Sequence, residues 1–312
     1  MMRIPLTLAI LMMSATTAAA LPVTVRSCNR DVTFDAPPAR AISNDVNLTE
    51  MMLVLGLRDR MVGFTGVSGW RTLDETMREG IAELPELSAG YPTKEVLVGA
   101  DPDFFFGGWN YGMKVGGEVT PETLAPFGVA VYELTESCIH IGPKGKVAME
   151  DMYNDILNLG KIFGVEAKAN DLVTAWKAQL AEVTANVDHD NPVRVFVYDS
   201  GEEAPFTAGK YAMPTAMIEA AGGVNIMDDL EKSWAEIGWE PVVERNPEVV
   251  VIVNYGDVTA EQKIAFMKAN PAFANIDAVK NDRFVVLEYV EATPGPRNIE
   301  AVEKLVAGFA PK

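Results

Sequence analysis

The chain has 312 residues, of which 48% are apolar and 22% are charged. This composition is typical of a globular protein with a sizeable core, and the length exceeds that of most single domains, so we expect two domains. The formal net charge of −18 argues against nucleic acid or an anionic membrane surface as a partner, because both are polyanions.

Residues 1–20 have the pattern of a secretory signal peptide. One cation, Arg3, precedes a short apolar run over 4–13, and three alanines at 18–20 form a small-residue cleavage site. The run is too short to span a bilayer, and the alternative interpretation is a buried N-terminal helix. We expect cleavage after about Ala20 and a mature protein in the periplasm.

Export makes the cysteine content informative. Cys28 and Cys138 are the only two cysteines, and both lie in the mature chain. An oxidising compartment favours a disulfide between them, with two buried free thiols as the alternative.

Predicted strands and helices alternate along most of the chain. The strands are expected at 41–43, 61–64, 104–106, 129–134, 193–198, 247–253 and 284–287. The helices between them are expected at 48–56, 93–98, 121–127 and 214–221, with a closing helix at 298–309. This alternation predicts an α/β fold with mainly parallel sheets that carry helices on both faces.

The segment 143–164 interrupts the alternation with a long amphipathic pattern. Its apolar residues recur at helical spacing, and Gly164 follows as a glycine that can end a helix. The apolar residues of this face are Met149, Met152, Ile156, Leu159 and Phe163. We expect an N-terminal lobe over 21–143, one long interlobe helix over 144–164, and a C-terminal lobe over 165–312.

The two halves repeat a pattern in the same order. Residues 95–106 and 240–251 each open with glutamate, have proline seven residues later, and continue through an acidic residue into an apolar strand. A weaker similarity links 49–56 with 215–222. The repeat indicates two structurally duplicated, Rossmann-like lobes.

Enzyme motifs are missing from the sequence. His140 and His189 have no second histidine or cysteine at ligand spacing, and no nucleophile elbow or Walker loop is present. We therefore predict neither catalytic residues nor a metal site, and no resident cofactor.

Aromatic residues instead collect in loops that follow predicted strands, where open α/β sheets bind ligands. The ones predicted to line a ligand cleft are Trp70, Trp109, Tyr111, Tyr198, Phe206, Tyr211 and Trp234. For each of them, a lid over the core is the alternative. Arg297 and Arg71 are predicted to pair with an anionic oxygen of the ligand, or else with acidic side chains of the protein.

Several segments together resemble a known family. They are 28–34 before Pro37 and Pro38, 49–57, 95–106, 159–164 and 206–210. Their order and spacing resemble those of periplasmic substrate-binding proteins of ferric-siderophore and cobalamin ABC importers, over essentially the whole mature chain.

The resemblance implies two α/β lobes joined by a single helix, with a ligand between them. It implies that Glu95 and Glu240 dock on arginines of a permease dimer, and that Trp234 matches a cobalamin-contacting tryptophan. The N-lobe tryptophan of the cobalamin branch corresponds to a position near Ala89 here.

The expected function is that of a monomer that delivers a metal chelate, in the first place a ferric siderophore. The alternatives are cobalamin or another large organic cofactor as the ligand, or a chelatase-like or nitrogenase-like enzyme component.

Overall fold

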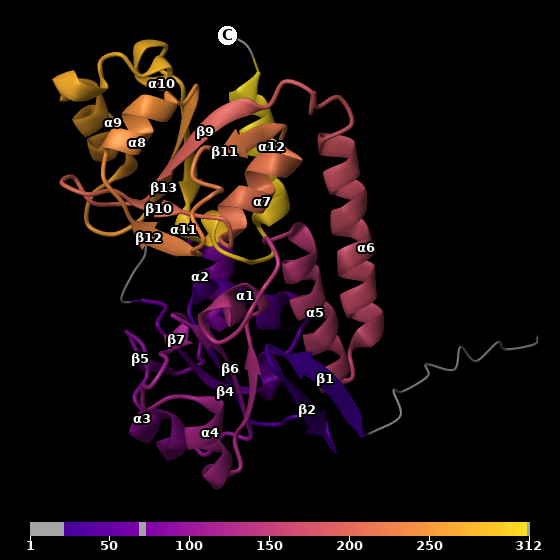
Figure 1. Cartoon of the computed structure of the whole chain (residues 1–312). Helices are drawn as coiled ribbons and strands as arrows, with labels where there is room; N and C mark the ends of the chain where they lie inside the picture. The colour runs from indigo at the N-terminus through magenta and orange to yellow at the C-terminus, as the bar shows by residue number, and fades with distance from the viewer. Residues whose placement is uncertain (1–21, 69–72, 311–312) are drawn as a thin grey trace, which may run out of the picture.

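The computed structural model describes residues 22–68 and 73–310. Two α/β lobes lie one above the other, and a pair of helices runs along one side of both (Figure 1). In the described part of the chain, no helix is both long enough and apolar enough to cross a membrane.

Among its described residues, the N-terminal lobe contains eight strands, six of them in one main sheet and two in a separate hairpin. The strands are β1 (Val23–Ser27), β2 (Arg30–Phe34), β3 (Ala41–Asn44), β4 (Met61–Thr65), β5 (Glu86–Ser88), β6 (Phe104–Trp109), β7 (Gly112–Met113) and β8 (Ala130–Glu133). The helices are α1 (Val46–Val54), α2 (Glu75–Ile81), α3 (Lys94–Gly99) and α4 (Pro121–Leu124), with short 3-10 turns η1 (Arg58–Arg60), η2 (Ala125–Phe127) and η3 (Thr135–His140).

The C-terminal lobe has a smaller sheet. Its strands are β9 (Val193–Tyr198), β10 (Phe206–Ala208), β11 (Gly223–Asn225), β12 (Trp234–Glu236), β13 (Val249–Asn254) and β14 (Phe284–Glu288). Its helices are α7 (Met213–Ala220), α8 (Glu240–Arg245), α9 (Ala260–Ala269), α10 (Asp277–Lys280), α11 (Tyr289–Ala292) and α12 (Asn298–Phe309), with a 3-10 turn η4 (Pro271–Phe273).

The strand orders of the two sheets confirm the duplication. In the N-terminal lobe β4, β3, β6 and β8 are neighbours, and in the C-terminal lobe the order is β11, β9, β13 and β14. Every pair in both series is parallel. In each lobe the strand that comes first in the chain, β3 or β9, is second in the series. The chain therefore connects to one side of this strand and then to the other, and open α/β sheets bind ligands in the crevice that such a reversal creates at the strand ends.

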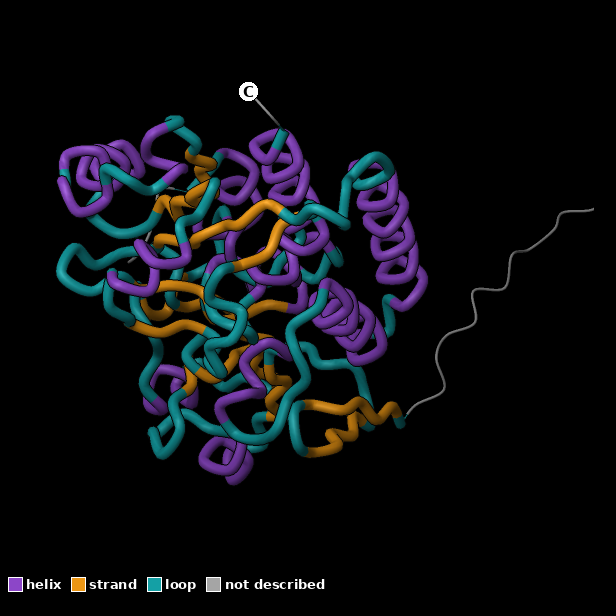
Figure 2. The backbone as a smooth tube through the Cα atoms, turned by 45° about the horizontal axis from the view of Figure 1, so that its top comes forward, coloured by secondary structure: helices purple, strands orange, loops and turns teal. Residues whose placement is uncertain are grey.

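Both faces of each sheet are covered, so the strands are apolar throughout rather than alternating. In β13, Val249, Val251 and Val253 pack into the large cluster against α7 and α12, while Val250 and Ile252 face the opposite side. Figure 2 shows the strands in the interior and helices around them.

The helix predicted over 144–164 has different bounds in the structure, and a second helix packs along it. Helix α5 (Met149–Phe163) begins five residues later than expected, and α6 (Glu166–Val183) runs back beside it and continues along the C-terminal lobe (Figure 1). The predicted apolar face of α5 is buried, and Gly164 ends the helix with φ 69°. The segment before α5 is extended because it already reaches the C-terminal lobe, where the Val147 amide bonds the Lys210 carbonyl.

Cys28 and Cys138 form the predicted disulfide, with 5.1 Å between their Cα atoms. Cys28 occupies the turn between β1 and β2, and Cys138 lies in η3. The bond fastens the N-terminal hairpin to the segment that leads into α5.

Candidate functional site

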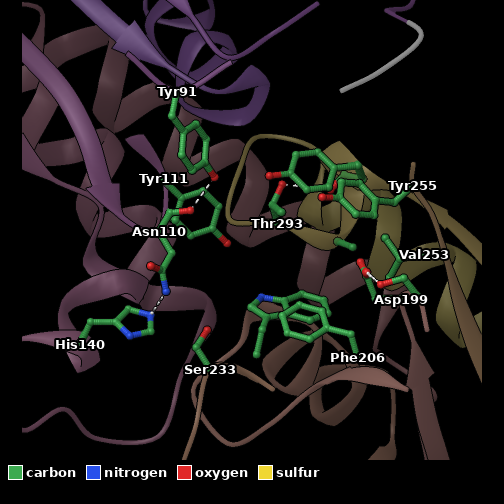
Figure 3. Close-up of a pocket in the computed structure, with 14 residues that line it drawn as sticks. Tyr91, Asn110, Tyr111, His140, Asp199, Phe206, Ser233, Val253, Tyr255 and Thr293 are labelled. Carbon is green, nitrogen blue, oxygen red and sulfur yellow. Dashed lines mark hydrogen bonds between the residues drawn. The ribbon is translucent and has the colours of Figure 1, made fainter. Parts of the chain in front are cut away.

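A cavity of about 340 Å³ lies between the lobes; we call it the interlobe cavity. It is lined by Tyr91, Asn110, Tyr111, His140, Asp199, Ser200, Phe206, Ser233, Trp234, Val253, Tyr255, Tyr289, Ala292 and Thr293. Most of these residues follow the carboxyl ends of β6, β9 and β13 or precede α12, and Figure 3 shows them converging from both lobes. This is the location that the strand orders predict.

The wall from the N-terminal lobe depends on a tight turn after β6. Asn110 has φ 67°, and Gly112 has φ 94° with its Cα so close to Asn44 that an added Cβ would lie 2.6 Å from the Asn44 Cγ. Only glycine tolerates both conditions. The turn brings Asn110 to His140, with 3.2 Å between Nδ2 and Nε2, and to Tyr91, whose hydroxyl donates to the Asn110 carbonyl at 2.6 Å.

Burial shifts the pKa of one histidine and two tyrosines that line the interlobe cavity. Burial, with a smaller effect of Lys232, lowers the pKa of His140, so its imidazole is neutral at neutral pH. Burial raises the pKa of Tyr111 and of Tyr289 well above the usual value. Both phenols therefore stay protonated, and each directs its hydrogen toward a carboxylate, Glu136 or Asp45, so that the hydroxyl oxygen is left as an acceptor rather than a phenolate for a metal.

The wall from the C-terminal lobe carries two pairs of stacked rings. Phe206 and Trp234 are diagonal neighbours in the antiparallel ladder of β10 and β12, because Phe206 pairs with Glu236 and Trp234 with Ala208. Their ring centroids lie 6.0 Å apart and their planes differ by 15°. Tyr255 and Tyr289 are 5.3 Å apart at 22°. Such rings give flat apolar area at low entropic cost, which suits a broad ligand.

Glu136 lies beneath the cavity and joins the two lobes. It is 1% exposed, and its carboxylate accepts from the Ser233 hydroxyl at 2.9 Å and from the Met213 amide at 3.1 Å. The Tyr111 hydroxyl lies 3.5 Å from the same carboxylate. Burial raises the pKa of Glu136 to about 7, against the hydrogen bonds from Ser233 and Met213, which lower it.

A second set of interlobe contacts lies on the side of α1. The Tyr289 hydroxyl donates to Asp45 at 2.8 Å, and the Asn47 amide donates to the Pro294 carbonyl at 2.7 Å. Arg297 bonds Glu50, with Nη2 2.6 Å from Oε1, and also pairs with Asp74. Tyr289 therefore belongs both to the cavity wall and to the contact between the lobes.

Three of the predicted ligand residues, Tyr111, Phe206 and Trp234, do line the interlobe cavity. Trp70 and Arg71 lie outside the described residues.

Trp109, Tyr198 and Tyr211 do not line the cavity, which corrects those predictions. Trp109 is 4% exposed, packs in the core beside α3, and donates from its indole to Glu133 at 2.9 Å. Tyr198 points into the opposite face of its sheet, edge-on to Trp239. Tyr211 bonds Glu231 at the surface of the C-terminal lobe.

Arg297 is likewise absent from the interlobe cavity, since its guanidinium is held by Glu50 and Asp74. The alternative considered from the sequence, an ion pair within the protein, is the one found. The arginine lies instead at a neighbouring cavity that shares Tyr289.

Sequence reasoning missed most of the C-terminal lobe's contribution. Tyr255 follows an apolar strand directly and could have been found by the rule that found Tyr111. Tyr289 lies in a short helix without a loop signal, and Tyr91 precedes a proline in a segment with no strong pattern.

Glu95 and Glu240 occupy equivalent places in the two lobes. Each is exposed and lies in the first turn of a short helix, α3 or α8, that precedes a core strand. Both helices lie on the side of the molecule away from α6 (Figure 1). Within the described residues, no group of three His, Cys, Asp or Glu side chains is placed to hold a metal ion.

Comparison with known proteins gives a consistent result. Residues 43–290 match the family of periplasmic binding proteins. An uncharacterized ABC transporter substrate-binding lipoprotein of Bacillus subtilis is 24% identical over 295 residues, which cover 93% of this chain and 86% of that protein. A cobalamin-binding protein of Halobacterium salinarum is 24% identical over 299 residues, 94% of this chain and 75% of that one.

Solved structures share the fold. A periplasmic binding protein from Veillonella parvula superposes with a TM-score of 0.82 at 28% identity, covering 93% of this chain and 98% of that one. An ABC-type Fe3+-hydroxamate transport system protein from Saccharomonospora viridis has a TM-score of 0.79 at 24% identity, with 94% and 100% covered.

Proposed function

Because the chain belongs to the periplasmic binding protein family, we propose that it captures a metal chelate between its two lobes and delivers it to the permease of an ABC importer. The chelate that fits best is a ferric siderophore. The observation that carries this proposal is the interlobe cavity with its six aromatic rings, contributed by Tyr91, Tyr111, Phe206, Trp234, Tyr255 and Tyr289.

The chemistry of this cavity suits an organic shell around a metal rather than a bare ion. The phenols of Tyr111 and Tyr289 are protonated and donate to carboxylates of the protein, so they are poor metal ligands and can accept hydrogen bonds from the chelate. The stacked rings offer apolar contact to the organic part of the chelate. The metal in this proposal is cargo, held by the chelator.

Cobalamin is the second candidate in the same class. It is supported by the relative from Halobacterium salinarum and by Trp234, which faces the cavity as the family resemblance implies. The cavity of about 340 Å³ lies near the lower end of the roughly 300–1,000 Å³ range of ligand pockets, which favours the smaller chelate.

The remaining parts of the proposal concern location and partners. A family of transport binding proteins has no catalytic role, and we propose that this member acts in the periplasm as a monomer after loss of residues 1–20. Glu95 and Glu240, one on each lobe, would dock on arginines of the two permease subunits, since two equivalent carboxylates suit a symmetric dimer.

The test is titration of tryptophan fluorescence in the mature protein with a ferric trihydroxamate, a ferric catecholate, ferric citrate and cyanocobalamin. Saturable quenching by one ferric chelate, but not by its metal-free form, is the expected result. Binding of cyanocobalamin alone would replace the siderophore by the second candidate. Absence of saturable binding across the whole panel would contradict the metal-chelate proposal.

A further inference from the structure

Lys263 is a charged residue on the buried face of a helix. It lies in α9 with Ala260 three residues before it and Met267 four residues after it, and all three are buried. Lys263 itself is only 1% exposed. A buried ammonium group is costly unless it is well hydrogen-bonded, so its retention in the core indicates a specific task.

The ammonium group bonds three backbone carbonyls. Its Nζ lies 2.7 Å from the Val253 oxygen and 3.0 Å from the Tyr255 oxygen, and it also donates to the carbonyl of Asp199. These three acceptors share one property: each belongs to a residue that lines the interlobe cavity. Figure 3 shows all three together on the wall from the C-terminal lobe.

The position of these carbonyls in the sheet explains why they need a donor. The ladder between β9 and β13 ends with the pair Tyr198 and Ile252. Beyond that pair the two strands no longer bond each other, because β9 ends while β13 continues beside β14 as far as Asn254. The two strands flank the point at which the strand connections change direction. A charged donor with three N–H groups can bridge the separating chains where ladder bonds no longer can.

We propose that Lys263 is a positioning residue of the interlobe cavity: its ammonium group holds the ends of β9 and β13 at the separation that places Asp199 and Tyr255 on the cavity wall. Lys263 does not touch the ligand; it acts through the backbone of residues that do. The part of this inference that concerns ligand affinity rests on the proposed function. The part that concerns the two strand ends does not.

The experiment is hydrogen–deuterium exchange of the ligand-free mature protein, because it needs no identified ligand. Lys263→Met should accelerate exchange at least tenfold in segments 199–206 and 253–258, and less than twofold in the peptides of the N-terminal lobe. Lys268→Met is the matched control, since Lys268 is on the same helix but pairs with Asp282 at the surface. Unchanged exchange in both segments, or an equal increase everywhere, would overturn the proposal.

Two further variants cover the case in which Lys263→Met does not fold. Lys263→Arg keeps the charge and the donors but is longer, so it should loosen the same two segments while the melting temperature stays near that of the wild type. The variant Lys263→Cys is unfolded with its disulfide intact and its new thiol is aminoethylated, which gives a side chain that ends in an ammonium group at nearly the length of lysine. After refolding, segments 199–206 and 253–258 should regain their protection from hydrogen exchange.

The binding measurement separates this inference from the proposed function. For whichever of the four panel compounds binds the wild type, Lys263→Arg should weaken affinity roughly tenfold, and aminoethylated Lys263→Cys should recover it. Failure of all four compounds to bind the wild type would count against the proposed function, while the exchange data still decide the role of Lys263. Exchange in Lys263→Arg that is identical to wild type in both segments would refute that role.

Discussion

The Glu136 carboxylate accepts a hydrogen bond from the Ser233 hydroxyl at 2.9 Å across the boundary between the lobes. Glu136 belongs to the N-terminal half of the chain and Ser233 to the C-terminal half, and Ser233 also lines the interlobe cavity. An acid group that is almost fully buried therefore connects the two lobes beside the interlobe cavity.

This location makes stability depend on pH. The folded pKa of Glu136, about 7, is raised above its ordinary value of 4.5, so the folded state binds the proton more tightly than the unfolded state. The stabilisation that protonated Glu136 adds to the free energy of unfolding is therefore complete below pH 4.5, and it is lost as the pH rises through 7. The loss amounts to roughly 3 kcal/mol, because each pH unit between the two pKa values is worth about 1.4 kcal/mol.

Urea denaturation at pH 5, 6, 7 and 8 checks this expectation in the wild type and in Glu136→Gln. The variant should show a flatter decline of the unfolding free energy, since it lacks the titrating group. Asp155, whose pKa burial also raises to about 7, remains in both proteins and so cancels in the comparison. Parallel curves for the two proteins would contradict the assignment to Glu136.

Trp109 and Trp234 should respond oppositely to truncation. Trp109→Ala leaves a hole in the core and an unpaired Glu133 oxygen, so we expect about 3–5 kcal/mol of destabilisation. Trp234→Ala should leave the melting temperature within a few degrees and weaken ligand affinity about tenfold, because its ring stacks on Phe206 in the cavity wall. Calorimetry and fluorescence titration of both variants, with Trp239→Phe as a core control, distinguish the two roles.

Arg297 should act mainly as an interlobe ion pair. Arg297→Met leaves the Glu50 carboxylate buried without its cation, which we expect to cost roughly 3 kcal/mol. Asp74 should contribute less, since it is partly exposed. The double variant Glu50→Gln with Arg297→Met should recover much of the loss in urea denaturation. A double variant as unstable as the sum of its single changes would show that the pair is not coupled.

Glu95 and Glu240 should matter for transport and not for capture. The double variant Glu95→Ala with Glu240→Ala should abolish uptake in cells that carry the cognate permease, while the affinity of the isolated protein for its ligand changes less than twofold. Glu122→Ala with Glu261→Ala is the matched control, because each of these exposed acids also lies in the first turn of a helix, one in each lobe. Normal uptake by the first double variant would remove the docking assignment.

The disulfide should stabilise the N-terminal lobe through the unfolded state. It closes a loop with a sequence separation of 110, for which chain entropy gives about 5 kcal/mol. Replacing Cys28 and Cys138 by serine, or adding dithiothreitol to the wild type, should lower the urea midpoint by the same amount. If dithiothreitol also lowered the urea midpoint of the serine variant, its effect on the wild type would have a cause other than reduction of this disulfide.

The sequence by itself determined the α/β architecture, the duplicated lobes and the disulfide. These features rest on local signals: the apolar strands alternate with helices, the pattern at 95–106 recurs at 240–251, and only two cysteines exist. The buried face of α5 was predictable for the same reason, because helical spacing depends only on near neighbours. The course of the chain between the lobes was not, since the antiparallel return along α6 depends on packing against both lobes.

The tertiary structure decided which aromatic and charged residues form the site. Trp109 ends strand β6 and Tyr111 follows two residues later, yet the left-handed turn at Asn110 leaves Trp109 in the core and places Tyr111 on the cavity wall. Lys263 and Tyr289 carry no local signal, because Lys263 joins Asp199, 64 residues away, to the end of β13, and Tyr289 bonds Asp45, 244 residues away. Side-chain direction and long-range pairing arise only when the layers assemble, and that is the physical reason why the sequence located the loops of the site but could not choose among their residues.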